Sequence, residues 1–372
     1  MKNEFLHVQQ AELNNYKLDL TNLRNITIYN NISQIGFCIK INYMDVTDIK
    51  NKMPIKGGEE FKLTLIDKYE NKFKKTLVVS NVIEVSNTNE QSTIIQLEFI
   101  TKEAFYLSIK RDYSYYENNT LDIIKNYLPD IDSNTKTTEV NNIVIPGFTY
   151  NKAIQYITQR TQNYVFEGTN NFIHSSLEDL LIATSSDTKV FKFNSNNPIN
   201  KELIIDYSEV QVFNSLDEGY NNAYNKTNTV YNPNSKTIST KNIKIKELQT
   251  NSKTLGSGEN YSTDIQDNIN TKYRVLPSYP NAVEYSDCDS LFNKHYDILV
   301  YGDLSLEIGE MVNIKYKDRF NANPNPLLNG LYMITKIAHH IDTVEFLSKL
   351  RISKNAYFKD VNNTGINDNV VL

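Results

Sequence analysis

The sequence contains few of the residues that usually mark disulfide-stabilised or metal-binding proteins. Among its 372 residues there are only 2 cysteines and 5 histidines. Two cysteines do not indicate a disulfide framework, although the sequence leaves a single bond between Cys38 and Cys288 open. Because Cys38 lies in an apolar, strand-like run, we expect its thiol to be buried like a small hydrophobic side chain.

Long apolar runs and an excess of basic residues are also missing. The 39 lysine and arginine residues are outnumbered by 44 aspartate and glutamate residues, so no basic domain indicates nucleic-acid binding. No stretch approaches the roughly eighteen apolar residues that a membrane-spanning helix needs. The N-terminal segment contains Glu4 and Glu12 and does not resemble a signal peptide. We therefore expect a soluble protein that is made in the cytoplasm and does not insert into a membrane.

The motifs of common enzymes are absent as well: the sequence has no HExxH, no paired CxxC, no Walker loop and no GxSxG. His339 and His340 are adjacent on a predicted strand, so they point to opposite faces and cannot bind one metal together. The carboxylate clusters Glu178-Asp179 and Asp287/Asp289 are predicted to be solvated faces or turns rather than a catalytic pair. The Asp287-Cys288-Asp289 stretch also lacks the remaining ligands of a calcium loop. We predict no catalytic, cofactor-binding or metal-binding residue, no cofactor and no enzymatic activity. We interpret His339 and His340 as structural or edge histidines; the other histidines are His7, His174 and His295.

The sequence does contain enough hydrophobic residues, 40% of the total, for two or three domains with their own cores. Over residues 1–111, apolar and polar residues alternate with the period of a half-buried strand, and we predict a small β domain. The alternating residues include Ile26, Ile28, Ile39, Ile41, Phe61, Leu63, Leu65, Ile95, Leu97 and Phe99. The 25 tyrosines and 16 phenylalanines fall mainly at strand positions, which favours core and interface packing over stacking on bases or sugars.

Residues 112–205 have a different pattern and predict a mixed α/β segment. Asn119-Thr120 is a candidate N-terminal cap of a helix that Pro129 ends, and Thr149 is a candidate cap of a second helix. The residues 164–166 and 172–174, separated by a turn, predict a β-hairpin.

Residues 206–231 and 282–358 predict a second small β domain. Ile298 and Val300, followed by Leu304, Leu306 and Ile308, alternate with polar residues and predict strands there. Residues 232–281 are a polar insertion that includes the flexible triplet Gly256-Ser257-Gly258, and residues 359–372 are expected to form a loose C-terminal tail. The predicted fold class is mainly β with an α+β middle: two small antiparallel β-barrel domains flank the mixed α/β segment.

The stretch from Asp297 to Ile352 also has a specific order of motifs. A strand is followed by Leu-x-x-Gly-x-x-Val-x-Ile, a polar loop, and Gly-x-Tyr-x-Ile-x-x-Ile-x-His-x-Ile. The matching residues are Leu306, Gly309, Val312, Ile314, Gly330, Tyr332, Ile334, Ile337, His339 and Ile341. This order resembles the last tube-type barrel of the baseplate central hub family of contractile-tail phages, which includes late-control proteins and the hub half of type VI secretion spikes.

The resemblance implies a structural virion protein of the tail baseplate, assembled in the host cytoplasm. Three copies would form a ring that joins the hexameric tail tube to a trimeric spike and leaves a channel for DNA. The implied partners are two further copies, the spike, the tail tube protein, baseplate wedge proteins and the tape-measure protein, while DNA would pass during genome ejection without specific binding. An acidic lumen would repel its phosphates. We expect Leu304–Ile308 and Ile26–Ile41 to provide strand edges for contacts between copies.

Two alternatives stay open at this point. One is a hub of a type VI-like or tailocin injection machine, which has the same architecture. The other is a soluble carbohydrate-binding or carbohydrate-active β protein, which would need a cleft with two converging carboxylates.

Overall fold

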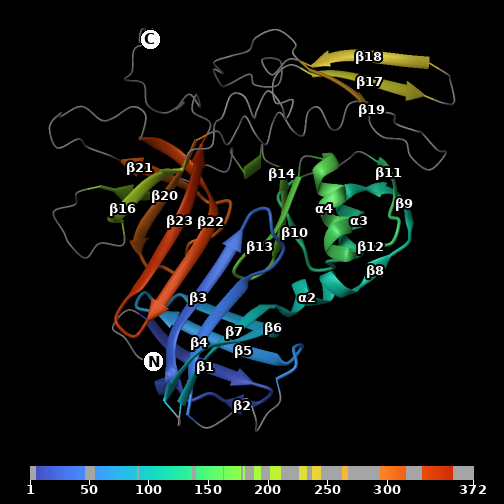
Figure 1. Cartoon of the computed structure of the whole chain (residues 1–372). Coiled ribbons are helices and arrows are strands. Elements are labelled where there is room, and N and C mark those ends of the chain that lie inside the picture. Colours follow the sequence, from blue (N-terminus) through green and yellow to red (C-terminus); the bar gives the residue numbers. More distant parts are fainter. Residues whose placement is uncertain are drawn as a thin grey trace.

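The structure, a computed structural model, is mainly β with a few short helices (Figure 1). It describes residues 6–46, 55–89, 92–135, 140–161, 163–176, 179–180, 188–193, 202–210, 226–232, 237–243, 262–266, 294–315 and 329–354. Gly256–Gly258, Glu178, Asp287, Asp289 and the tail 359–372 lie outside these ranges. In the described part of the chain, no helix is both long and apolar enough to cross a membrane.

Most of the strands join one 13-stranded sheet. Its path runs through β16 (Ile204–Val210), β20 (Lys294–Tyr301), β23 (Phe346–Lys354), β22 (Gly330–Asp342), β3 (Leu23–Asn31), β4 (Cys38–Asp45), β7 (Ser92–Thr101), β6 (Lys72–Asn89), β5 (Glu60–Asp67), β1 (Leu6–Leu13) and β2 (Tyr16–Lys17). All neighbours on this path are antiparallel. β21 (Met311–Lys315) pairs with β22 and, in parallel, with β15 (Lys189–Lys192).

The strands β22 and β3 join the two ends of the chain within this sheet. Their register runs from Lys336 opposite Asn31 to Asp342 opposite Asn25. We call this pairing the seam. Because β22 also pairs with β23 and β21, the seam makes the C-terminal and N-terminal strands one continuous sheet (Figure 1).

The sheet encloses two separate hydrophobic cores, one on each side of the seam. The first core contains the inward residues of β1 and β3 to β7, such as Ile26, Phe61 and Phe99. The second contains residues of β20 to β23, such as Val300 and Met333. Bulges at Val79/Asn81 in β6 and at Ile334/Lys336 in β22 interrupt the register, and a bulge bends its strand.

The predicted fold class is confirmed in its main feature, a mainly β protein with antiparallel pairing. Within the described ranges, however, no strand pairing closes either end of the sheet into a barrel. The two barrels and the domain boundaries therefore stay predictions.

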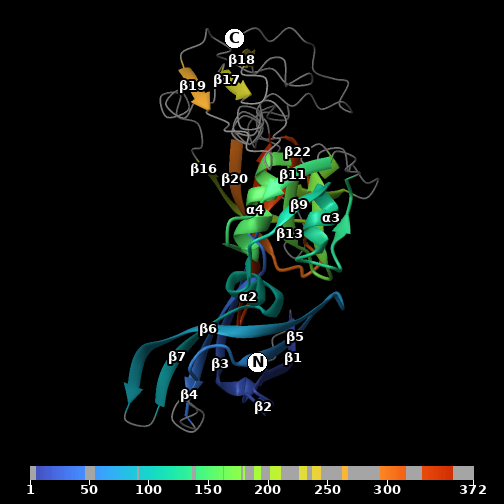
Figure 2. The same cartoon turned by 90° about the vertical axis from the view of Figure 1, so that its right-hand side faces the viewer.

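The middle of the chain forms a third core around three helices. These are α2 (Lys102–Ile109), α3 (Thr120–Lys125) and α4 (Tyr150–Thr161). Short strands surround them: β8 (Arg111–Asp112), β9 (Tyr115–Asn119), β10 (Asp132–Ser133), β11 (Val140–Val144), β12 (Phe148–Thr149), β13 (Asn163–Glu167) and β14 (Phe172–Ser176). Figure 2 shows α2 between the strands β6 and β7 and the remainder of this middle unit.

Most local signals in the middle unit are confirmed. The expectation that Pro129 ends the first helix was wrong, because α3 already ends at Lys125, where the Asn126 side chain donates to the carbonyls of Asp122 and Ile123. The Asn119 side chain accepts a hydrogen bond from the Asp122 N–H (2.8 Å) and caps α3. Thr149 Oγ1 accepts one from the Lys152 N–H (3.3 Å) at the start of α4. The hairpin is also present, with β13 antiparallel to β14. Within the predicted insertion 232–281, β18 (Thr237–Ile243) and β19 (Ser262–Gln266) both pair with β17 (Lys226–Asn232), which begins before it, in a separate sheet.

Three expectations about individual segments were wrong. Residues 304–308 form turns and a short connection rather than a strand: Leu304 packs in the first core while Leu306 and Ile308 pack in the second, so their alternation reflects two cores and not a pleat. For the same reason Leu304–Ile308 offers no strand edge. Ile26–Ile41 offers none because β3 and β4 are both paired on their two sides. Cys38 is half-buried, since Ile39 and Ile41 take the inward positions of β4.

Candidate functional site

The five histidines are dispersed, and two of them form buried structural hydrogen bonds. His174 shares a hydrogen bond with Ser133 Oγ (3.0 Å), and His339 shares one with Ser348 Oγ (2.7 Å). His340 is exposed on the opposite face of β22, as the sequence predicted for adjacent residues of a strand. Over the ranges that the structure describes, no group of three histidine, cysteine or carboxylate residues could hold a metal ion. His7 is exposed on β1, and His295 contacts Ser353.

Asp179, one member of a predicted carboxylate cluster, has a local structural role. Its Oδ2 accepts hydrogen bonds from Thr135 Oγ1 (2.5 Å) and Ser176 Oγ (2.6 Å). These bonds lower the pKa of its carboxyl, the Ser176 bond most strongly. The side chain therefore tethers the end of β14 to the loop after β10.

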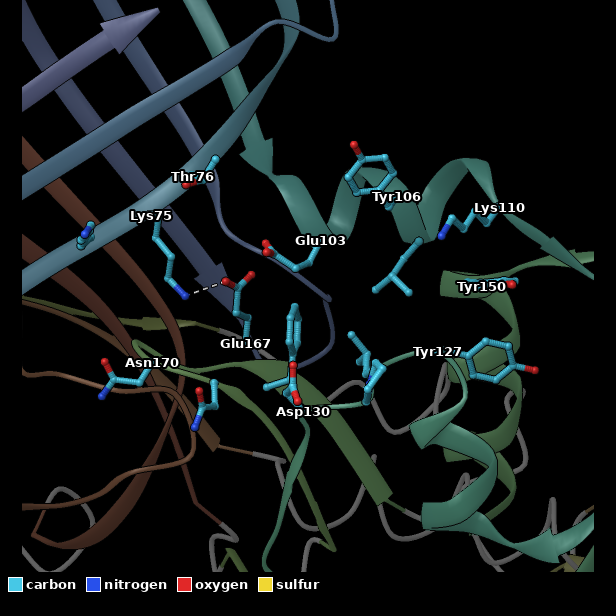
Figure 3. A pocket seen from close by; sticks show the side chains of 16 residues that line it. Lys75, Thr76, Glu103, Tyr106, Lys110, Tyr127, Asp130, Tyr150, Glu167 and Asn170 are labelled. Carbon is cyan, nitrogen blue, oxygen red and sulfur yellow. Dashed lines mark hydrogen bonds and ion pairs between the residues drawn. The ribbon is translucent and has the colours of Figure 1, made fainter. Parts of the chain in front are cut away.

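The polar cluster of greatest interest lies where the middle unit meets the first core (Figure 3). Lys75 of β6 forms an ion pair with Glu167, the last residue of β13, at an Nζ–Oε1 distance of 2.6 Å. Thr101 Oγ1 donates to the other oxygen of Glu167 (2.7 Å), and Asn30 Nδ2 donates to the Glu167 carbonyl (2.8 Å). Lys75 also donates to the carbonyl of Gly168 (3.2 Å). Four segments of the chain, β3, β6, β7 and the end of β13, are joined at this point.

Both charges of this pair are removed from water. The side chains of Lys75 and Glu167 are 10% and 3% exposed. Burial raises the pKa of the Glu167 carboxyl, and the Lys75 ammonium opposes that shift. Gly36, in the loop between β3 and β4, allows this loop to pack closely against α2, since an added Cβ at Gly36 would lie 2.4 Å from Cβ of Ala104. Such a pair fixes the position of the β13–β14 turn against the sheet.

A cleft of about 470 Å³ lies beside this pair. In Figure 3, Lys75 and Thr76 of β6 lie on one side, while Glu103 and Tyr106 of α2 and Lys110 at its C-terminal end lie on another. The remaining lining residues belong mostly to the segment after α3, such as Asp130, and to the β13–β14 turn and the start of β14, such as Asn170 and Phe172. Clefts between structural units are common binding places.

A second groove, of about 550 Å³, lies on the outer face of the seam. Four cationic side chains line it: Lys40, Lys336, Lys349 and Arg351. Two carboxylates partly neutralise them: Asp297 accepts from Arg351 Nε (2.7 Å) and pairs with Lys349 (3.3 Å), and Glu98 pairs with Lys40 (2.7 Å). The groove is therefore basic on a chain whose net charge is -5.

The sequence did not reveal the polar cluster where the middle unit meets the first core, which we call the junction cluster. Lys75, Thr101 and Glu167 belong to three different predicted elements, and nothing local distinguishes them from other strand residues. One sequence signal could have indicated this cluster. Lys75 is a charged residue at a position of an alternating strand that points inward, where an apolar residue is expected.

This combination of one antiparallel sheet, two cores and a helical middle unit is a fold of phage tail proteins and of a type VI secretion component. No protein-family model and no curated protein sequence matches the chain. The resemblance predicted from the last strands is thus confirmed by the fold alone.

Two of the similar solved structures are tail proteins. One, from Neisseria meningitidis MC58, has a TM-score of 0.63 and 9% identity and covers 95% of this chain and 98% of its own. The other, the 43 kDa tail protein of prophage MuSo2 from Shewanella oneidensis, has a TM-score of 0.61 and 11% identity, with 95% and 99% coverage. An Escherichia coli type VI secretion component has a TM-score of 0.52 and 7% identity, with 95% and 78% coverage.

Proposed function

We propose that this chain is a structural subunit of a phage tail baseplate, the hub that joins the tube to the spike. The observation that supports it most strongly is a fold shared along nearly the whole length with two tail proteins. The resemblance of the last strands to hub proteins supports the same assignment independently of that likeness.

In this proposal three copies form a ring. The two cores of each chain would place six similar β units around a channel, matching a six-fold tube, while the ring itself would match a trimeric spike. The partners are the spike, the tail tube protein, wedge proteins and the tape-measure protein. DNA passes through the channel during genome ejection, in a virion assembled in the host cytoplasm, and the chain contributes structure rather than catalysis.

A second candidate is a hub of a type VI-like or tailocin injection machine. The likeness to an Escherichia coli component of the type VI secretion system favours it, and that likeness covers 95% of the present chain. Both candidates predict the same ring, and they differ in the cargo that crosses it.

The test is the oligomeric state of the purified full-length chain, alone and mixed with the candidate spike protein. Mass photometry should give three times the 43.0 kDa chain mass, and electron-microscopy class averages should show a three-fold ring with an open centre. A chain that stays monomeric even with the spike present contradicts the proposal. Binding of the monomer to an array of glycans would then favour the carbohydrate-binding alternative.

A further inference from the structure

The strand β6 has a free edge next to the cleft beside Lys75 and Glu167, which we call the junction cleft. From Lys72 to Val78 it pairs with β5 on one side. On its other side the pairing with β7 begins only at Leu77, opposite Thr101, where β7 ends and α2 turns away. Within the described residues, the segment 72–76 therefore has a strand on one side only.

The register shows which backbone groups face this edge. The Asp67 N–H donates to the Asn71 carbonyl (3.0 Å), so Asp67 and Asn71 form the first hydrogen-bonded pair of the hairpin that joins β5 to β6. Bonded and non-bonded pairs alternate in an antiparallel ladder, so Phe73 and Lys75 bond to β5. The N–H and C=O groups of Lys72 and Lys74 point the other way, toward the free edge. A strand edge of this kind is a template for another strand.

The cleft of about 470 Å³ lies along this edge and is lined by Lys74, Lys75 and Thr76. The ion pair between Lys75 and Glu167 holds the β13–β14 turn beside it (Figure 3). On the wall formed by α2, Tyr106 is 45% exposed, and Lys110 Nζ lies 5.8 Å from the centre of its ring. The edge is thus accessible from solvent and bordered by an amphipathic wall.

We propose that this cleft accepts an extended segment of another protein, which adds to β6 as an antiparallel strand beside Lys72–Thr76. Main-chain hydrogen bonds supply affinity in this mode of recognition, and side chains at alternate positions supply specificity. This proposal does not rest on the proposed trimeric ring.

Charge indicates the chemistry of the partner. The side chains of Lys72 and Lys74 are exposed on the same face of β6, and neither forms an ion pair with another described residue. Residues directly opposite each other across a strand pair interact, and opposite charges stabilise the pair. Glu103 and Asp130 on the other walls disfavour a polyanion. The expected segment therefore has carboxylates at alternate positions with uncharged residues between them.

The probe is an end-capped, fluorescein-labelled peptide, Thr-Glu-Val-Glu-Val-Thr, titrated with the full-length chain in fluorescence anisotropy. In the proposed register the two glutamates lie opposite Lys72 and Lys74 and donate their N–H groups to β6. Methylating the nitrogens of both glutamates should weaken binding at least about tenfold, because two hydrogen bonds are lost. Methylating both valines should change it little, since their N–H groups point away from β6.

Protein variants test the same geometry. Lys74→Pro removes the outward N–H without touching the ladder to β5, and proline is tolerated at such edge positions, so affinity should fall about tenfold. Lys74→Thr keeps the N–H and should cost only about threefold. Lys349→Thr, on the outer face of the seam, is the matched remote control and should bind like the wild type.

Thermal melting establishes that each variant is folded. Saturable binding that follows this order supports the strand site. No saturation at millimolar peptide overturns it. Equal binding by wild type and a folded Lys74→Pro variant, or by the two methylated peptides, overturns it as well.

Discussion

Among single residues, three histidines act as neutral hydrogen-bonding groups inside the protein. His174, His295 and His339 each contact a serine hydroxyl, and burial lowers the pKa of each to about 4. A histidine that must be neutral in the folded state links stability to pH. The lowered pKa values follow from the burial of the three side chains. The positions of the histidines in the sequence do not reveal that burial.

The pH dependence has a definite sign. In the unfolded chain these histidines titrate near 6.5, so between pH 6.5 and about 4 the unfolded state binds protons that the folded state does not. Their contribution to stability is complete above pH 6.5 and is lost as the pH falls toward 4, at up to about 1.4 kcal/mol per pH unit for each. Urea unfolding at pH 7.5, 6 and 5 measures the slope, and His339→Asn should make it shallower. Equal stability at pH 7.5 and 5 contradicts the prediction.

The ion pair between Lys75 and Glu167 makes a second prediction for single residues. Glu167→Leu or Lys75→Met leaves one buried partner uncompensated, and each should lower the free energy of unfolding by about 3–5 kcal/mol. The double variant Lys75→Met/Glu167→Leu should recover much of that loss, because no buried charge is left. Denaturant titrations of the complete double-mutant cycle measure the coupling.

The control for this cycle is the exposed pair of Lys192 and Glu202, whose side chains are 47% and 37% exposed. Lys192→Met should change stability by less than about 1 kcal/mol. Additive effects of the two substitutions at the buried pair would show that Lys75 and Glu167 do not depend on each other.

Among the elements, those that depend on neighbouring residues could be predicted from the sequence. The capped start of α3, the hairpin β13–β14 and the strand around Ile298 and Val300 all follow from spacing and caps. The seam could not be predicted, because pairing between β22 and β3 is decided by packing across the whole chain. The junction cleft escaped prediction for the same reason.

The segment 302–310 shows why alternation can mislead. Its apolar side chains enter two cores in turn, which imitates the period of a strand. Gly302 ties this segment to β23: its N–H donates to the Phe346 carbonyl (2.8 Å), and an added Cβ would lie 2.1 Å from Cγ of Phe346. The glycine is required by this close approach.

We therefore expect Gly302→Ala to be destabilising by about 1–3 kcal/mol or more, because Phe346 is buried and must move. Gly58→Ala is the matched control: it has a φ of +92° but no atom within 4 Å of an added Cβ, so only backbone strain of about 1 kcal/mol applies. Thermal unfolding of both variants measures the difference. A smaller effect at Gly302 than at Gly58 would show that the loop can relax.

For the whole molecule, the distribution of charge constrains how a ring could be built. The groove on the outer face of the seam is lined by Lys40, Lys336, Lys349 and Arg351. A channel that repels the phosphates of DNA needs an acidic lumen. We expect a ring of three copies to turn this basic groove away from the channel. An electron-microscopy map at side-chain resolution would decide this, and Lys336 and Lys349 in the lumen would refute the acidic-lumen hypothesis.

The seam also determines when the sheet can be completed during translation. Thr27 of β3 and His340 of β22 share a hydrogen bond although they are 313 positions apart. While the ribosome synthesises the intervening chain, β3 has β4 on one side and an unfilled edge on the other. That edge closes only when β22 emerges, and contacts so distant in sequence form slowly. A chain that stops before β22 therefore lacks the pairing that completes the sheet.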